Sequence, residues 1–284
     1  MEVLNFGGDG PVRILVLVLV GVASGLVNTL ASSGSAISLP VLMFLGLPPG
    51  NANATNRLAC MLGSMMALRT FHSDHMIDWK AGRRMLAPAV LGSVIGVLAA
   101  ERLPGRDMGL VITAALMVAL LLIFTKIKAV LARPHTQPSH VTFAGLVVLF
   151  GVGIWLGFIA LDGNTYLLLV LMVLFHFDLP QANALKILLM FATTVLPVAI
   201  FAWSGSIWWK DGLVLSAGSL AGSFAGARLS RYAGARRWVF RLLVAAISLE
   251  VVHLGAAYYG DVRAHFTITS QTHPYTQSGR DRQH

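Results

Sequence analysis

The sequence predicts an all-α integral membrane protein built from two inverted repeats, and three observations support this prediction. Only 12% of the 284 residues are charged and 56% are hydrophobic, which leaves too few charges to cover a soluble globule of this size. Long apolar segments recur along most of the chain. Two distant motifs also repeat with one common spacing, and basic loops alternate so that the two copies point in opposite directions.

The basic charge balance has a membrane explanation. A net charge of +9 would suggest a nucleic-acid partner in a soluble protein, but here the Lys and Arg residues lie between apolar runs. We therefore expect no nucleic-acid partner. Cys60 is the single cysteine, so the chain can form no intramolecular disulfide and no cysteine-rich metal site. The residues before the first apolar segment include Glu2 and Asp9 but no basic stretch, so we expect no cleaved signal peptide.

Ten apolar segments are expected, and most approach the roughly 20 residues that a helix needs to cross about 30 Å of hydrocarbon. In order they are Val12–Ala31, Ala36–Leu45, Ala52–Leu68, Met85–Ala100, Met108–Phe124, Val141–Ala160, Tyr166–Phe177, Ala182–Trp203, Leu213–Ala227 and Trp238–Tyr258. The second and seventh segments are too short to span, and Pro40 interrupts the second. Residues 261–284 are polar, and we expect a disordered tail there.

The first short segment follows a run of small polar residues, which are Asn28, Thr29, Ser32, Ser33, Gly34 and Ser35. A backbone that leaves the helix at membrane depth exposes polar groups at several kcal/mol each, so such breaks occur where they line a cavity or are buried in protein. Two half-helices are the simplest interpretation, and the amino-terminal amides of the second would attract an anion. Asn53, Asn56 and Arg57 open the next long segment and add a full positive charge.

A repeat relates the two parts of the chain. The tripeptide Ala52-Asn53-Ala54 recurs as Ala182-Asn183-Ala184, and Gly92, Ser93 and Gly96 recur as Gly222, Ser223 and Gly226, both at an offset of 130 residues. One register that joins two distant motifs favours a duplication, with copies at 12–133 and 141–258. The polar break then has its counterpart in Asp162, Gly163, Asn164 and Thr165, and Arg57 is answered by Lys186 at an offset of 129.

The placement of charge predicts that the copies are inverted. In the first copy the basic loop follows the third apolar segment and holds Arg69, Lys80, Arg83 and Arg84. In the second copy it follows the fourth apolar segment and holds Arg228, Arg231, Arg236, Arg237 and Arg241. Because basic loops stay in the cytoplasm, equivalent loops face opposite sides and both termini lie outside. Each half then needs an odd number of crossings. Five spans, or three spans plus a re-entrant hairpin, meet that condition and give 8 to 10 membrane segments in total.

The polar residues at the breaks are candidates for binding an anion. Arg57 and Lys186 could clamp an oxyanion, or they could extend to the membrane interface. The small polar residues of the first break, together with Asn53, Asn56, Gly163, Asn164, Thr165 and Asn183, could line the site, or they could serve helix capping and packing. Asp162 could carry a coupling proton, or it could cap the short helix that follows.

Other polar groups have simpler interpretations. His72 and His75 lie in a short cytoplasmic connection with Asp74 and Asp78, and we expect a solvated loop there and not a metal site. The paired glycines of the repeated Gly-Ser motif favour close helix packing. We expect no metal and no cofactor.

The stretch GLVNTLASSGSAISLPVLMFLGLPPGNANATNRLACMLGS, together with LPQANALK in the second half, resembles the sulfite exporter family of the TauE/SafE type. These are bacterial and plant membrane proteins associated with the movement of sulfur oxyanions and organosulfonates. The resemblance covers most of the chain from Val12 to Leu254. The chain departs from the family pattern in its Ser-Ser-Gly-Ser break, in Arg57 where Lys is common, and in Asp162 where small residues are usual.

We therefore expect a secondary transporter, an exporter or exchanger, that carries a small anion by alternating access around a midplane site. The resemblance implies a sulfur oxyanion or organosulfonate such as sulfite or sulfoacetate. The alternatives are a passive anion channel and a membrane-embedded enzyme or sensor, although we expect no enzyme. We expect a multi-pass protein of the bacterial plasma membrane with its termini outside the cytoplasm. The sequence leaves open a coupling proton or sodium ion and a homo-oligomer.

Overall fold

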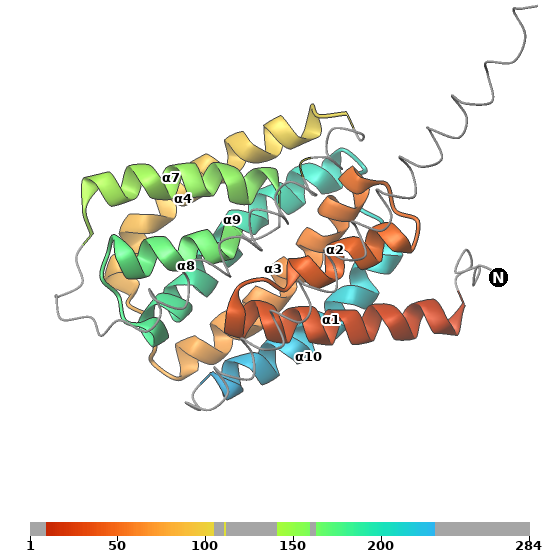
Figure 1. Cartoon of the computed structure of the whole chain (residues 1–284), viewed down its shortest axis with the longest axis horizontal. Helices are drawn as coiled ribbons and strands as arrows, with labels where there is room; N and C mark the ends of the chain where they lie inside the picture. Colours follow the sequence, from red (N-terminus) through yellow and green to blue (C-terminus); the bar gives the residue numbers. More distant parts are fainter. Residues whose placement is uncertain (1–9, 105–110, 112–140, 160–162, 231–284) are drawn as a thin grey trace, which may run out of the picture.

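The computed structural model describes residues 10–104, 111, 141–159 and 163–230. Within these residues the protein has eight α-helices and no strand, which confirms the all-helical expectation (Figure 1). Of the described helices, three are long and apolar enough to cross a membrane by length and composition: Pro11–Ala31, Trp79–Glu101 and Leu179–Trp203. The segments expected at Met108–Phe124 and Trp238–Tyr258 and the tail at 261–284 lie outside the described residues.

The helices follow the expected segments closely. They are α1 (Pro11–Ala31), α2 (Ser35–Phe44), α3 (Pro49–Ser73), α4 (Trp79–Glu101), α7 (Phe143–Phe158), α8 (Gly163–Val173), α9 (Leu179–Trp203) and α10 (Trp209–Leu229). Pro40 does not end the second segment, because α2 continues through it. Asp78, Thr142 and Asp178 begin α4, α7 and α9, and each side chain accepts a hydrogen bond from a backbone N–H of the first turn.

Each short helix turns back along the helix that precedes it. Nη1 of Arg13, at the start of α1, donates to the carbonyl oxygen of Leu45, just after α2, at 3.0 Å. The chain therefore returns to the end of the molecule from which α1 began. In the second hairpin, the rings of Trp155 in α7 and Tyr166 in α8 meet edge to face with centroids 6.0 Å apart.

The described helices pack as two bundles, and each bundle includes one helix from the other half of the sequence. The first bundle combines α1, α2 and α3 with α10, and the second combines α7, α8 and α9 with α4 (Figure 1). The fourth helix along the chain therefore packs with the second hairpin, and the last described helix packs with the first hairpin. The principal helix contact between the bundles is that of α3 with α9.

Glycines bring the exchanged helices into backbone contact. A Cβ atom at Gly21 would overlap the carbonyl oxygen of Leu215, and a Cβ atom at Gly222 would overlap the carbonyl oxygen of Val22. The backbones of α1 and α10 are therefore in contact through glycines on both helices. The contact of α7 with α4 is built in the same way, from Gly153 and Gly157 on α7 and from Gly92 and Gly96 on α4. This confirms the close packing expected at the repeated glycines.

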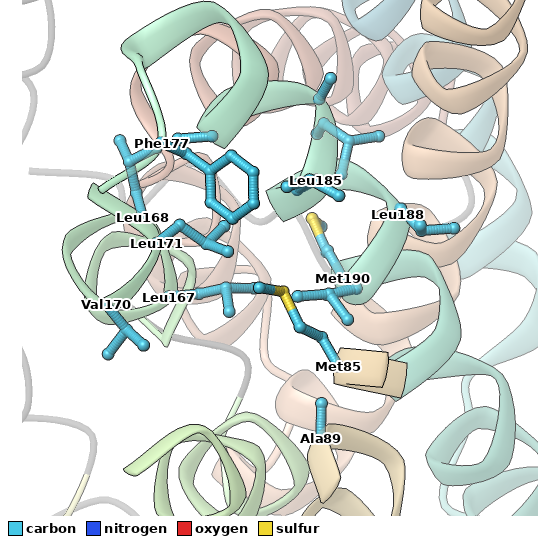
Figure 2. Close-up of a cluster of buried hydrophobic side chains, with 14 of the residues drawn as sticks. Met85, Ala89, Leu167, Leu168, Val170, Leu171, Phe177, Leu185, Leu188 and Met190 are labelled. Atoms are coloured by element: carbon cyan, nitrogen blue, oxygen red, sulfur yellow. The ribbon is translucent and has the colours of Figure 1, made fainter. Parts of the chain in front are cut away.

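Apolar side chains fill the second bundle and cover its outside. A cluster between α4, α8 and α9 includes Met85, Leu171, Leu185 and Met190, and Figure 2 shows these side chains pointing toward one another. Large apolar side chains on α1, α4, α7 and α9 are exposed, as expected for helices that face lipid. The Trp203 side chain at the end of α9 is 94% exposed, which is typical of an aromatic residue at a membrane interface.

Gly157→Leu should destabilise the fold, because its side chain would collide with backbone atoms of Ser93 that cannot move aside. We expect a loss of roughly 3 kcal/mol or more, the upper part of the overpacking range. The measurement is the thermal unfolding midpoint of the purified protein in detergent. Gly151→Leu on the same helix is the matched control, since a Cβ there meets no atom within 4 Å. Equal midpoints in the two variants would contradict the packing of α7 on α4.

Candidate functional site

The two breaks meet inside the protein. Oγ of Ser33, just before α2, lies 3.1 Å from Oγ1 of Thr165 in the first turn of α8. Nδ2 of Asn164 donates to Oδ1 of Asn28, near the end of α1, at 3.1 Å. The side chains of Asn28 and Asn164 are buried. Residues more than 130 positions apart in sequence therefore form one polar junction between the two hairpins.

The Ser-Ser-Gly-Ser sequence explains how the first break is made. Ser32 ends α1 in the left-handed conformation with φ 73°, and its N–H donates to the carbonyl oxygen of Asn28 at 3.1 Å. Gly34 follows at a point where a Cβ would overlap the carbonyl oxygen of Ser24, so only glycine fits without a shift. The hydroxyl of Ser24 donates to the carbonyl oxygen of Gly34 at 2.9 Å, which satisfies a buried polar group.

The amino-terminal ends of α2 and α8 lie next to each other at this junction. The helix α2 has ten residues, and its N-cap Gly34 has no side chain to offer to the first-turn amides. Oγ of Ser35 lies 3.4 Å from Sγ of Cys60 on α3. Both helices point their partial positive ends at the same buried region, where an anion would be stabilised.

Lys186 of α9 binds the carboxyl-terminal end of α1. Its Nζ donates to the carbonyl oxygens of Asn28 and Thr29 at 3.1 and 3.3 Å and to Oγ of Ser32 at 3.0 Å. These three bonds use all three hydrogens of the ammonium group. The last carbonyls of a helix have no partner within it, and a cation there is favoured by the helix dipole.

Arg57 of α3 binds the corresponding end of α7. Its Nη1 and Nη2 donate to the carbonyl oxygens of Leu156 and Gly157 at 2.6 and 2.7 Å. Asn53, one turn earlier, donates through Nδ2 to the carbonyl oxygen of Phe158 at 3.2 Å. The guanidinium carbon also lies 5.5 Å from the centre of the Phe201 ring on α9. Each bundle therefore caps the broken helix of the other.

Both cations lie deep in the protein. The side chains of Arg57 and Lys186 are 0% exposed, so neither extends to an interface. Each stands about 10 to 12 Å along a helix about 37 Å long, close to the breaks. Both charges thus lie near the breaks, and their hydrogen bonds go to the helix ends there.

Four buried Asn and Arg side-chain atoms have no hydrogen-bond partner among the described residues: Asn56 Nδ2, Arg57 Nε, Asn164 Oδ1 and Asn183 Oδ1. Oδ1 of Asn56 accepts from the hydroxyl of Ser38 on α2 at 2.6 Å. A buried polar atom without a partner costs about 1–3 kcal/mol, so four of them in one region mark a place where a ligand could bind.

The remaining sequence candidates lie around this junction or beyond the described residues. The hydroxyl of Thr29 donates to the carbonyl oxygen of Gly25 on its own helix, and Gly163 packs against Leu156 of α7. Asp162 lies outside the described residues. At the far end of α3, His72 contacts the Trp79 ring edge to face.

Sequence reasoning missed several contributors. Ser24 and Ser38 build the hydrogen-bond network behind α2, and both are isolated hydroxyls in apolar runs, a signal that was available. Met190, which belongs to the core cluster of Figure 2, accepts from Nδ2 of Asn28 through its sulfur at 3.4 Å. Phe201 also has no sequence signal, because its role depends on where Arg57 lies.

Comparison with known proteins gives a consistent set of relatives. A family model described as "Sulfite exporter TauE/SafE" matches residues 17–252. A "Probable membrane transporter protein" of Haemophilus influenzae is 27% identical over 218 residues, 76% of this chain and 84% of the relative. "Probable membrane transporter protein ORF9" of Sinorhizobium is 25% identical over 80% of this chain and 87% of the relative. "Probable membrane transporter protein YfcA" of Escherichia coli is 25% identical over 77% of this chain and 81% of the relative. No solved structure shows a significant match.

Lys186→Met should destabilise the protein by about 2–4 kcal/mol, because it leaves two buried carbonyls of α1 without a donor. The check is again the thermal unfolding midpoint in detergent. Lys80→Met is the matched control, since Lys80 is exposed at the start of α4. If Lys186→Met unfolds at the same temperature as Lys80→Met, the capping role is wrong.

Proposed function

Because the chain belongs to the sulfite exporter TauE/SafE family, we propose that it is a secondary transporter that carries a small anion through the membrane by alternating access. The match over residues 17–252 covers most of the chain, and the named relatives are described as probable membrane transporters. The observation that supports an anion is the meeting of the amino ends of α2 and α8 at a buried polar junction.

The proposed site is the junction itself. The first-turn amides of α2 and α8 and the hydroxyls of Ser33 and Thr165 would replace the hydration of the bound anion. Arg57 and Lys186 bring positive charge near it, in buried surroundings where Coulomb interactions are stronger than in water. Since the hydrogens of Lys186 are used by α1, this residue contributes its charge and the position of the helix end.

We propose that the two bundles, and not the two halves of the sequence, are the units that move. The helices of the first half pair with those of the second by order and length, and α1 on α10 corresponds to α4 on α7. This correspondence supports two copies of one unit. In each bundle, a hairpin and a long helix of one copy pack through glycines on a helix of the other copy. This close packing makes each bundle a rigid unit.

The described charges support an inverted orientation of the copies. Exposed basic residues gather where α3 and α10 end and α4 begins, namely Arg69, Lys80, Arg83, Arg84 and Arg228. Among the described residues, the opposite end, where α1 begins, has fewer basic residues, namely Arg13, Arg102 and Lys210, and Arg13 is paired with Asp211 at 2.7 Å. Under the positive-inside rule the first end is cytoplasmic, which puts the start of α1 outside.

The family description names sulfite, which supports a sulfur oxyanion as the solute, and the resemblance noted in the sequence adds organosulfonates as candidates. Sulfite and sulfoacetate are therefore the first solutes to test. Asp162 remains the candidate for a coupling proton.

The sharpest test is a cross-link between the bundles. In a Cys60→Ser background, Ser33→Cys/Thr165→Cys places two thiols at a contact where the native oxygens are 3.1 Å apart. Oxidation should block the counterflow of radiolabelled sulfoacetate in proteoliposomes, because the hairpin tips can no longer separate, and reduction should restore it. The uncross-linked protein should show saturable flux.

The matched control joins two residues of one bundle. Ser24→Cys/Ser38→Cys links α1 to α2 across a native oxygen separation of 3.2 Å, so oxidation should leave flux at the level of the reduced variant. Flux that never saturates and survives the Ser33–Thr165 cross-link would support a passive channel. An absence of anion flux in every sample would contradict the proposed function.

A further inference from the structure

The four unpartnered atoms near the junction divide by chemistry. The two N–H donors, Asn56 Nδ2 and Arg57 Nε, belong to consecutive residues of α3 in the first bundle. The two acceptors, Asn164 Oδ1 and Asn183 Oδ1, belong to α8 and α9 in the second. All four side chains are at least nine-tenths buried.

Neighbouring contacts fix which atom of two of these amides is unpaired. Oδ1 of Asn56 is held by Ser38 at 2.6 Å, so the atom without a partner is its nitrogen. Nδ2 of Asn164 donates to Asn28 at 3.1 Å, so the atom without a partner is its oxygen. Lys186, one turn after Asn183 on α9, has no hydrogen left for either acceptor.

Asn56 and Asn164 lie on two sides of one junction, and Asn183 lies one turn before Lys186, whose Nζ binds the end of α1. Asn56 binds Ser38 in the first turn of α2, and Arg57 stands one turn before Cys60, which contacts Ser35. Asn56 therefore contacts the first turn of α2, and Arg57 follows it on the same helix. Asn164 is the second residue of α8, whose amino end touches that of α2.

The alignment of the two copies gives an independent reason why an unpaired donor lies in the first copy and not at the same position in the second. At the offset of 130 that pairs Asn53 with Asn183, the position equivalent to Lys186 is Asn56, and Arg57 follows one residue later. In the second copy this position holds a cation whose hydrogens are all used on α1. In the first copy the next residue, Arg57, does the capping and Asn56 keeps a free N–H.

We propose that the site takes a bipolar solute, an oxyanion that carries its own hydrogen-bond donor, such as a hydroxyl, an amine or an acid proton. This inference rests on the proposed function and names the substrate class of the same site. The charged end binds the amino end of α2 with Asn56 and Arg57, and the donor binds Asn164 and Asn183. An anion without a donor leaves both acceptors unpaired, and sites of this kind reject such analogues strongly.

The test compares two sulfonates that differ by one hydroxyl, 2-hydroxyethanesulfonate and ethanesulfonate. Dissociation constants are measured by calorimetry on the full-length protein in detergent. We expect the hydroxyl-bearing ligand to bind at least tenfold more tightly. Asn183→Leu and, independently, Asn164→Leu should reduce this ratio to near one by weakening the hydroxyl-bearing ligand and sparing ethanesulfonate.

Asn51→Leu is the matched control, because this amide of α3 donates to the carbonyl oxygen of Ser206 away from the junction, and it should keep the full ratio. Thermal unfolding of each variant shows that it is folded. Equal affinity of the two ligands for the natural protein would overturn the inference and leave anion transport intact. A ratio that persists in both folded variants would overturn it too. Absence of binding by either ligand together with absence of counterflow would contradict the proposed function itself.

Discussion

The structure depends on how helix ends are satisfied in the interior of a membrane protein. Breaking α1 and α7 leaves carbonyl groups without partners at depths where water is not available to bind them. Lys186 and Arg57 solve this problem, and each does so from the bundle opposite to the helix it caps. The same contacts that make the breaks tolerable therefore hold the two bundles together and bring two positive charges to the amino ends of α2 and α8.

Much of this arrangement could be predicted from the sequence, because membrane segments are marked by strong local signals. The apolar runs gave every described helix, and the small polar residues from Asn28 to Ser35 located the first break. The repeated glycines indicated close packing, and the structure places them where helix backbones touch. Pro40 was misleading, since a proline at membrane depth can stay within a helix when neighbouring helices support it.

The partners of the cations could not be predicted, because they lie about 100 to 158 residues away in sequence. From the sequence, Arg57 and Lys186 could clamp a ligand or extend to the membrane interface, whereas in this structure both are buried and their hydrogen bonds go mainly to helix ends. Their charge and their location near the breaks were readable, but the direction of a long side chain was not. The packing of α4 in the second bundle and of α10 in the first could not be predicted either, because contacts between helices distant in sequence leave no local signal.

The account is tested most directly by locating a bound oxyanion in crystals grown with selenite, whose selenium scatters anomalously. The account predicts an anomalous peak at the junction of the amino ends of α2 and α8, within hydrogen-bonding distance of Asn56 and Arg57. A peak found solely beside exposed basic residues such as Lys80 and Arg84, with nothing bound at the junction, would contradict it.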